Sequence, residues 1–184
     1  KIPDQMICGM AGVLDSARFS HFLATELKIS VSQVSSYVLG GHGDTMVPLV
    51  ELSNVAGISL TELVRTKKLS QECLDQIVER TRKGGGEIVN LLKSGSAYYA
   101  PAHSAISMAD SYINDLNKIF PAACKLLNNE YDVSEPMFVG VPAKINAKGI
   151  NEIIEVSLSD GEKENLQKSI DSVIELNKAY EQLK

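Results

Sequence analysis

The sequence predicts an α+β fold in which long helices pack on an antiparallel meander of strands. Three observations support this prediction. Helical patterns dominate residues 14–116, three strand candidates follow one another in residues 119–156, and a last helix closes the chain. This order lacks the regular βαβ alternation of a nucleotide-binding sheet. A chain of 184 residues is most simply one domain, and it can bury roughly 70% of its unfolded surface without metals or disulfides.

The first predicted helix covers Leu14–Ile29. Asp15, Arg18, Phe19 and Phe22 recur at i, i+3, i+4 and i+7, which places all four on one helical face. A carboxylate and a guanidinium beside two phenylalanines are costly unless each has a partner. Two interpretations remain open: a helix cap with a surface ion pair, or a pair that faces inward and has partners there.

A strand is predicted at residues 34–39, which are rich in β-branched and aromatic side chains. A glycine-rich loop follows at residues 40–43, and a short strand or turn covers residues 47–52. Ser59 and Glu62 then have the S-x-x-E spacing of a capping box, which predicts the start of a short helix.

A long helix is predicted from Gln71 to Lys93. Its inward stripe is expected to contain Leu74, Ile77, Val78, Thr81, Gly85, Ile88, Val89 and Leu92. Gly84–Gly86 interrupt this helix at a cost of about 3 kcal/mol relative to three alanines. They indicate either a helix break, or a close approach by a neighbouring backbone or a moving element. The next helix spans Ala97–Leu116, with Pro101 in its first turns, where proline is tolerated.

The three strand candidates are separated by turn-forming residues, which favours an antiparallel meander. The strands are expected at Ile119–Leu127, Met137–Ile145 and Ile150–Val156. A second capping box, formed by Ser159 and Glu162, opens the last helix.

Composition excludes several classes of function. The formal net charge is −5, whereas a nucleic-acid binder needs a basic face. No apolar run approaches the ~20 residues of a membrane span. The three cysteines (Cys8, Cys73 and Cys124) form no CxxC pair, which indicates a reduced cytoplasmic protein rather than a disulfide scaffold or a zinc site. The chain contains no G-x-G-x-x-G after a strand and no P-loop, so any main dinucleotide-binding domain lies outside it.

His42 is the histidine best placed for chemistry. Glycines flank it in a loop directly after the predicted strand, and such loops often carry catalytic groups. The alternative is a solvated loop histidine, and His21 and His103 are weaker candidates still. The residues alone leave three hypotheses open: an enzyme half, a dimerisation domain in which these residues are scaffold, and a metal-dependent hydrolase that uses His42, Asp44 and Asp15. The last has little support, because no second histidine has ligand spacing.

Three segments together resemble the carboxy-terminal domain of the lactate/malate dehydrogenase superfamily. They are GMAGVLDSARF (residues 9–19), LGGHGDTMVP (residues 39–48) and KGGGEIVNLLKSGSAYYAPA (residues 83–102). The resemblance covers nearly the whole chain and implies a substrate-binding, catalytic domain over residues 1–184. It further implies that the amino-terminal NAD-binding Rossmann domain of the parent enzyme is absent from this chain, so the chain alone is expected to be inactive.

The resemblance also implies a role for each motif residue. His42 would be the acid/base group, and Asp15 would accept a hydrogen bond from its other ring nitrogen. Arg18 would grip the substrate carboxylate with two parallel hydrogen bonds. Ala97 would stand beside the substrate, and Pro101 would face the nicotinamide of NAD.

The substrate implied is malate, interconverted with oxaloacetate. GMAGVLD is similar to the malate enzymes of the lactate dehydrogenase-like branch, and Ala97 stands where lactate enzymes usually carry threonine. L-Lactate is the alternative substrate, because the discriminating loop is expected in the other half. The resemblance further implies a cytoplasmic homo-oligomer, a dimer or tetramer, with no nucleic-acid or membrane partner.

Overall fold

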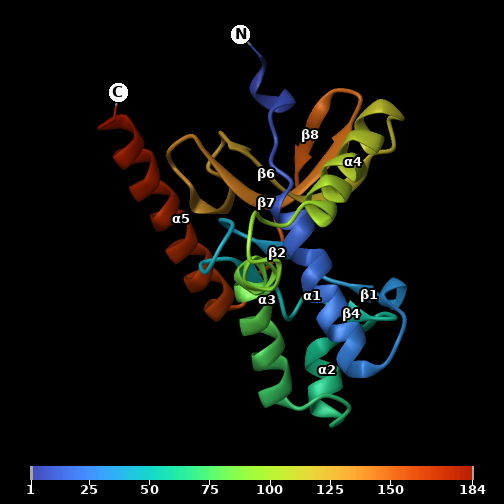
Figure 1. Cartoon of the computed structure of the whole chain (residues 1–184). Coiled ribbons are helices and arrows are strands. Elements are labelled where there is room, and N and C mark those ends of the chain that lie inside the picture. Colours follow the sequence, from blue (N-terminus) through green and yellow to red (C-terminus); the bar gives the residue numbers. More distant parts are fainter. Residues whose placement is uncertain (1, 184) are drawn as a thin grey trace.

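The computed structural model describes residues 2–183 and confirms the α+β fold. Its largest sheet is an antiparallel meander of β6 (Lys118–Leu126), β7 (Met137–Asn146) and β8 (Gly149–Ile153), with β7 in the centre. Figure 1 shows α1 (Ala11–Leu27) crossing the middle of the molecule, with α4 (Tyr99–Ile113) and α5 (Asp160–Glu181) on opposite sides of the sheet. Helix α1 packs against the sheet and also contacts α3 (Gln71–Leu92) and α4.

The sheet builds one of the two main cores. Alternate residues of β7, including Val139 and Val141, are fully buried and face α5 (Asp160–Glu181) through Leu166 and Ile170. The predicted capping box opens α5, since Ser159 Oγ accepts from the Glu162 N–H and the Glu162 carboxylate accepts from the Ser159 N–H.

The second core joins α1 to α2 (Leu60–Arg65) and to the first part of α3 (Gln71–Leu92). Phe19 and Leu23 of α1 are completely buried there, and Leu74 of α3 packs against them. The predicted capping box at Ser59 is present in half, because Ser59 Oγ accepts from the Glu62 N–H at the start of α2. Within residues 2–183, three short 3-10 helices complete the helical elements: Asp4–Met6, Val31–Gln33 and Glu130–Asp132.

The prediction of one strand over residues 34–39 is wrong. The segment splits into β1 (Val34–Ser35) and β2 (Val38–Leu39), which pair with different partners. Strand β1 joins β4 (Asn54–Val55) and β5 (Ile58–Ser59), whereas β2 pairs with β3 (Val47–Pro48). Side chains explain the split, because Ser36 Oγ donates to the Ser16 carbonyl and Ser16 Oγ accepts from the Val38 N–H. Ser16 of α1 thus accepts hydrogen bonds from this segment where a partner strand would otherwise pair with it.

The glycine triplet does not break α3, which is continuous from Gln71 to Leu92. Gly84 is buried, and a Cβ added there would lie 3.2 Å from Cδ of Arg18. The prediction of a helix break is therefore wrong, and the close neighbour of Gly84 is a side chain, whereas the alternative expected a backbone or a moving element. The expected inward stripe fails at its end, where Val89 and Leu92 are 42% and 48% exposed.

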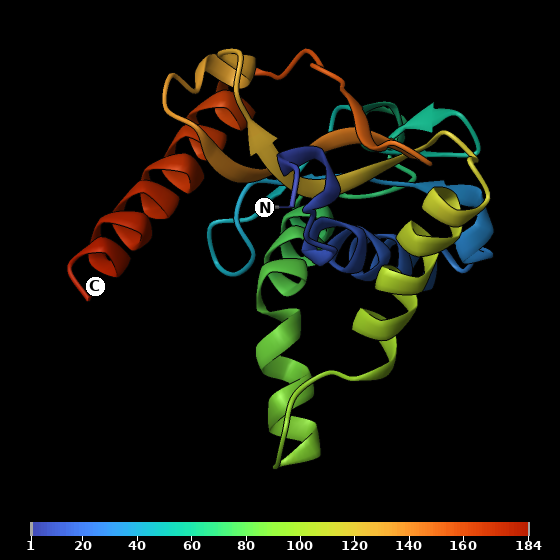
Figure 2. The ribbon, with the colours of Figure 1, turned by 90° about the horizontal axis from the view of Figure 1, so that it is seen from above.

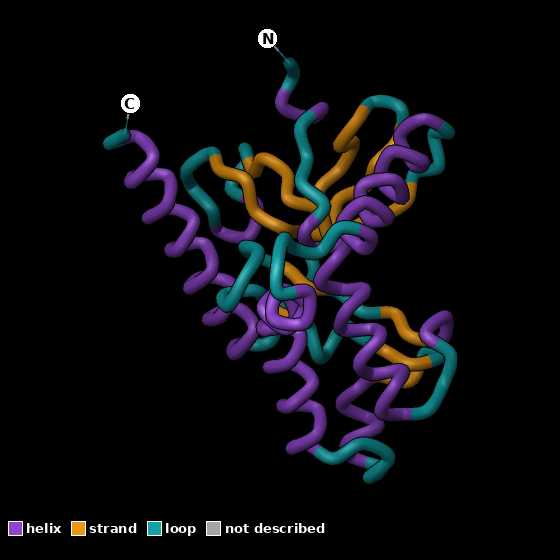
Figure 3. Tube along the Cα trace, in the orientation of Figure 1, coloured by secondary structure: helices purple, strands orange, loops and turns teal. Residues whose placement is uncertain are grey.

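Helix α4 (Tyr99–Ile113) is shorter than predicted, and Ala97 lies in the connection that precedes it. Pro101 is in its first turn, as expected. Figure 2 shows the end of α3 projecting away from the sheet, and Figures 2 and 3 show the connection that runs back from it to the start of α4. Among residues 2–183, no helix combines the length and the apolar character needed to cross a bilayer.

Candidate active site

Asp15 and Arg18 lie one turn apart on α1 and face inward, which resolves the two interpretations of this pair. Asp15 is 1% exposed, and Arg18 Nη1 donates to its Oδ1 at 2.9 Å. Within the described residues, Arg18 Nε is buried without a hydrogen-bond partner. A buried unpaired donor on a guanidinium is costly, so this side chain has unused capacity to bind an anionic group.

His42 meets the other oxygen of the same carboxylate. Its Nδ1 lies 2.7 Å from Asp15 Oδ2, while the ring itself is half exposed. The hydrogen bond to Asp15 raises the pKa of His42 above its usual value, against the opposing effects of burial and the Arg18 charge. Asp15 thus links a histidine that can carry a proton to an arginine that can bind an anion.

The backbone around this histidine is fixed by contacts from several elements. The Ser16 Oγ–Val38 N contact of 2.9 Å ties β2 to α1, directly beside Asp15. Gly40 exchanges two backbone hydrogen bonds with Gly140 of β7. Because these contacts join segments far apart in the sequence, no local pattern could have predicted them.

A cleft of about 660 Å³ opens beside these residues, between α1, the histidine loop and α3. It is lined by Arg18, His42, Gly43, Asp44, Met46, Arg82, Lys83, Gly85, Gly86, Glu87, Asn90 and Leu91. Helix α3 forms one wall, to which Gly85 and Gly86 contribute. Sequence reasoning missed the polar residues of α3, above all Arg82, whose Nε donates to the Met46 carbonyl at 3.2 Å. The helical spacing of Arg82, Gly86 and Asn90, which puts them on one face, could have indicated them.

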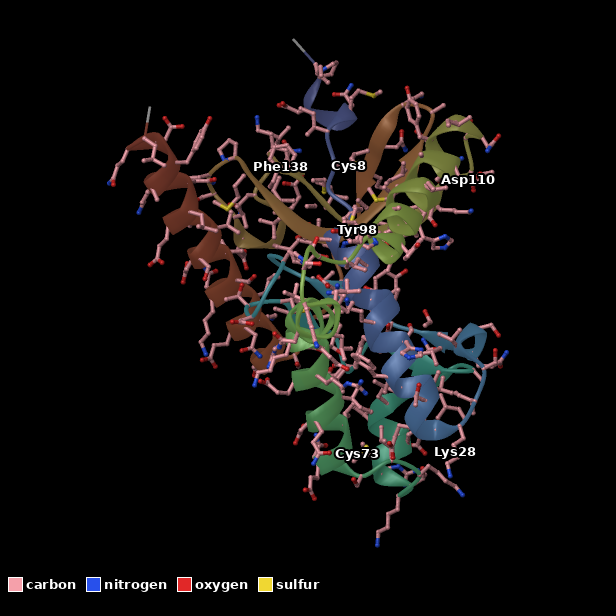
Figure 4. The ribbon with its side chains drawn as sticks, in the orientation of Figure 1. Cys8, Lys28, Cys73, Tyr98, Asp110 and Phe138 are labelled. Atoms are coloured by element: carbon pink, nitrogen blue, oxygen red, sulfur yellow. The ribbon has the colours of Figure 1, made fainter. Side chains whose placement is uncertain are left out.

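The structure does not bring Ala97 and Pro101 to this cleft. Ala97 lies in the α3–α4 connection and Pro101 in the first turn of α4, and neither lines the cavity. Their neighbours Tyr98 and Tyr99 are 62% and 92% exposed, and Figure 4 shows Tyr98 where this connection reaches α4. The roles implied for Ala97 and Pro101 stay predictions.

The described residues contain no group of three or more His, Cys, Asp or Glu side chains that could hold a metal ion. Asp44 lines the cleft beside His42, but nothing in the structure supports the metal-dependent hydrolase hypothesis. All three cysteines are free, and Figure 4 shows Cys8 and Cys73 far apart, in the upper and lower parts of the view.

Comparison with known proteins identifies the family of this chain. A family profile described as the alpha/beta carboxy-terminal domain of lactate/malate dehydrogenase matches residues 12–183. The chain belongs to the lactate/malate dehydrogenase family. Within this family, the malate dehydrogenase of Francisella philomiragia is 61% identical over 178 residues, which are 97% of this chain and 56% of that protein.

Solved structures of the family share the fold. The lactate dehydrogenase of Eimeria maxima with NADH and oxamate gives a TM-score of 0.94 at 44% identity, covering 99% of this chain and 54% of that one. The malate dehydrogenase of Cryptosporidium parvum gives a TM-score of 0.94 at 42% identity, covering 98% of this chain and 57% of that one. The malate dehydrogenase of Plasmodium falciparum in complex with NADH gives a TM-score of 0.92 at 40% identity, covering 100% of this chain and 60% of that one. The chain therefore spans little more than half the length of these relatives.

Proposed function

We propose that this chain is the catalytic, substrate-binding half of an NAD-dependent malate dehydrogenase. The observation that carries the proposal is that the buried carboxylate of Asp15 lies 2.7 Å from His42 Nδ1 and also accepts a hydrogen bond from Arg18 Nη1 at 2.9 Å. This arrangement joins a proton carrier and an anion-binding group at the edge of one cleft. Those are the two functions that oxidation of a 2-hydroxy acid requires of a protein.

His42 is the acid/base residue of the proposed reaction. In the direction of malate oxidation, its neutral imidazole takes the substrate hydroxyl proton at Nε2, because Nδ1 is engaged by Asp15. Asp15 fixes the ring orientation and stabilises the imidazolium that forms. In the opposite direction, the imidazolium donates the same proton to the carbonyl oxygen of oxaloacetate. The raised pKa of His42 favours the proton-loaded form that reduction needs.

Arg18 binds the carboxylate beside the reacting carbon. Its guanidinium is mostly buried, and its unpaired Nε shows that the chain itself does not use all of its donors. A planar guanidinium can give a carboxylate two parallel hydrogen bonds. Because the same group contacts Asp15, substrate binding and the acid/base pair are mechanically coupled.

NAD fits this chain only at its nicotinamide end. Pro101 is half-buried in the first turn of α4, shortly after the exposed Tyr98 and Tyr99, and its apolar ring suits one face of a flat ring. The sequence offers no glycine fingerprint for the pyrophosphate. When bound, the nicotinamide supplies the acceptor for the hydride that leaves the substrate. Pro101 would contact that ring, and Ala97 would lie beside the substrate.

The relatives support malate as the substrate, since those at 60–61% identity are named malate dehydrogenase. Lactate is the second candidate, favoured by the close fit to the lactate dehydrogenase of Eimeria maxima. We also infer that the active enzyme includes an amino-terminal NAD-binding half, self-associates as a dimer or tetramer, and is cytoplasmic. The 184-residue chain alone is expected to have no dehydrogenase activity.

The test is NAD-dependent oxidation of malate and of lactate by the full-length protein that contains this chain. We expect malate to be preferred, and we expect His42→Asn to lower kcat about 10²- to 10⁴-fold while folding is retained. His21→Asn is the matched control, because His21 is exposed on α1 and does not line the cleft. Unchanged turnover in His42→Asn would favour the dimerisation domain instead, and activity of the isolated chain would refute its predicted inactivity.

A further inference from the structure

Ser169 of α5 touches the loop that carries the candidate catalytic histidine. Its side chain is completely buried, and its Oγ accepts a hydrogen bond from the Gly41 N–H at 2.7 Å. The same hydroxyl donates to Thr45 Oγ1 at 3.4 Å. Gly41 directly precedes His42, and Thr45 follows it by three residues. One serine therefore contacts the loop on both sides of the histidine, although it lies 128 positions away from Gly41 in the sequence.

Gly40 packs directly against this serine, where a side chain would collide with the hydroxyl. Gly40 has φ +83°, and a Cβ added there would lie 2.5 Å from Ser169 Oγ. On its other side, Gly40 exchanges backbone hydrogen bonds with Gly140 of β7, at 2.8 and 3.1 Å. The entry to the loop is thus held between β7 and α5, with no room for a side chain.

The histidine ring itself has little to hold it. The ring is half exposed, and among the described residues its hydrogen-bond partner is Asp15. Asp15 is rigidly placed, since α1 is buried and Ser16 ties that helix to β2. The separation between the imidazole and the carboxylate therefore depends on where the loop backbone lies.

We propose that Ser169 is a positioning residue for the reaction. It holds the His42 loop from α5 so that the imidazole meets Asp15, and it makes α5 part of the catalytic apparatus without touching substrate. The catalytic consequence rests on the proposed dehydrogenase function. The positional consequence does not, because it concerns only the contact between His42 and Asp15.

Removing the hydroxyl should affect the proton-transfer step more than substrate binding. In Ser169→Ala the Gly41 N–H loses its partner, and the loop can leave the position that aligns the ring. Misplacement by about 1 Å can cost on the order of a hundredfold in rate, so we expect kcat to fall about ten- to a hundredfold. The KM for malate should change less than about threefold, since Arg18 and its contacts are untouched.

The pH profile should move in a defined direction. Asp15 raises the pKa of His42 mainly through their hydrogen bond, so a looser contact lowers that pKa. Malate oxidation needs neutral His42, and its acid limb should therefore move to lower pH. The other charged groups near the ring are Arg18 on α1, Asp44 in the loop, and Arg82, Lys83 and Glu87 on α3. Ser169→Ala alters none of them.

The experiment compares three variants of the full-length protein. Ser169→Ala removes the hydroxyl, and Ser169→Cys keeps a group of similar shape that bonds weakly. Ser111→Ala is the matched control, because Ser111 is also completely buried, donates to the Ile145 carbonyl and accepts from the Lys118 N–H. Each variant is measured for kcat, KM, the pH profile and thermal unfolding. The titration of His42 is followed by NMR, with its signal assigned from His42→Asn.

Support requires a fall in kcat and a lower pKa of His42 in Ser169→Ala, an intermediate effect in Ser169→Cys, and neither change in Ser111→Ala. A loss of stability alone, equal in Ser169→Ala and Ser111→Ala with an unshifted pH profile, would overturn the proposal. If the wild type oxidises neither malate nor lactate, the proposed function fails separately. The NMR titration then decides the positioning role, and an unchanged pKa of His42 in Ser169→Ala refutes it.

Discussion

The two parts of the molecule that carry candidate site residues are built very differently. Asp15, Arg18 and His42 lie in a packed half, in which α1 is buried between the sheet and the first part of α3. Ala97 and Pro101 lie in a projecting arm, residues 85–106, which combines the end of α3 with the start of α4 (Figure 2). The arm exposes large apolar side chains, such as Leu91 at 75% and Tyr99 at 92%.

This difference shows which part of the site the chain completes by itself. In the packed half, every functional side chain has a partner or a buried position within the chain. In the arm, the apolar pattern is not satisfied by the chain's own core, so its sequence indicates a helix without indicating what surrounds it. Exposed apolar patches of this kind are typical of interaction surfaces.

The largest expected effect is a difference in the free energy of unfolding between variants of the packed half and of the arm. Leu74 and Leu91 lie on the same helix, but Leu74 is 1% exposed and Leu91 is 75% exposed. In the 184-residue chain, Leu74→Ala should lower the free energy of unfolding by about 2–5 kcal/mol, whereas Leu91→Ala should change it by less than about 0.5 kcal/mol. Urea unfolding measures both. Equal losses would mean that the arm is packed within this chain, and the comparison would fail.

The next effect concerns binding in the packed half. Arg18→Lys keeps the positive charge but removes the planar fork that can bind a carboxylate and Asp15 together. In the full-length enzyme we expect kcat/KM for malate to fall about ten- to a hundredfold, because hydrogen bonds to charged groups are worth about 1.5–3 kcal/mol.

The matched control for this variant is Arg80→Lys. Arg80 pairs with Glu87 on the exposed surface of α3 and packs over the Phe22 ring. It does not line the cleft, so its replacement should leave kcat/KM nearly unchanged. A lysine at position 18 that preserved kcat/KM would show that charge alone, without guanidinium geometry, serves the site.

Periodicity predicted the packed half well, for physical reasons. The i, i+3, i+4, i+7 spacing of Asp15, Arg18, Phe19 and Phe22 follows directly from helix geometry, and all four lie on the face it predicted or at its edge. Apolar patterns likewise indicated the meander, because its alternate residues face one core.

Contacts between distant segments could not be predicted in the same way. The split of residues 34–39 involves hydrogen bonds to Ser16, and the lack of a side chain at Gly84 leaves room for Arg18. Ser169 carried no motif at all, since its importance comes from packing α5 on the histidine loop. The exposure of Val89 and Leu92 was also unpredictable, because a stripe fixes which side is apolar but not whether another element covers it.

The smallest expected effect probes the contact between the helix wall and Arg18. Gly84→Ala adds a methyl group that would lie 3.2 Å from Arg18 Cδ, whereas Gly86→Ala meets nothing within 4 Å. In the 184-residue chain, Gly86→Ala should stabilise by up to about 1 kcal/mol through helix propensity, while the crowding in Gly84→Ala should offset most of that gain. In the full-length enzyme, Gly84→Ala should raise the KM for malate a few-fold, because the Arg18 side chain must move by roughly a few tenths of an ångström to make room for the methyl group. Urea unfolding and steady-state kinetics give the two readouts. If both alanines stabilised equally and Gly84→Ala left KM unchanged, Arg18 would have free space against α3, and the glycine would not be needed to seat it.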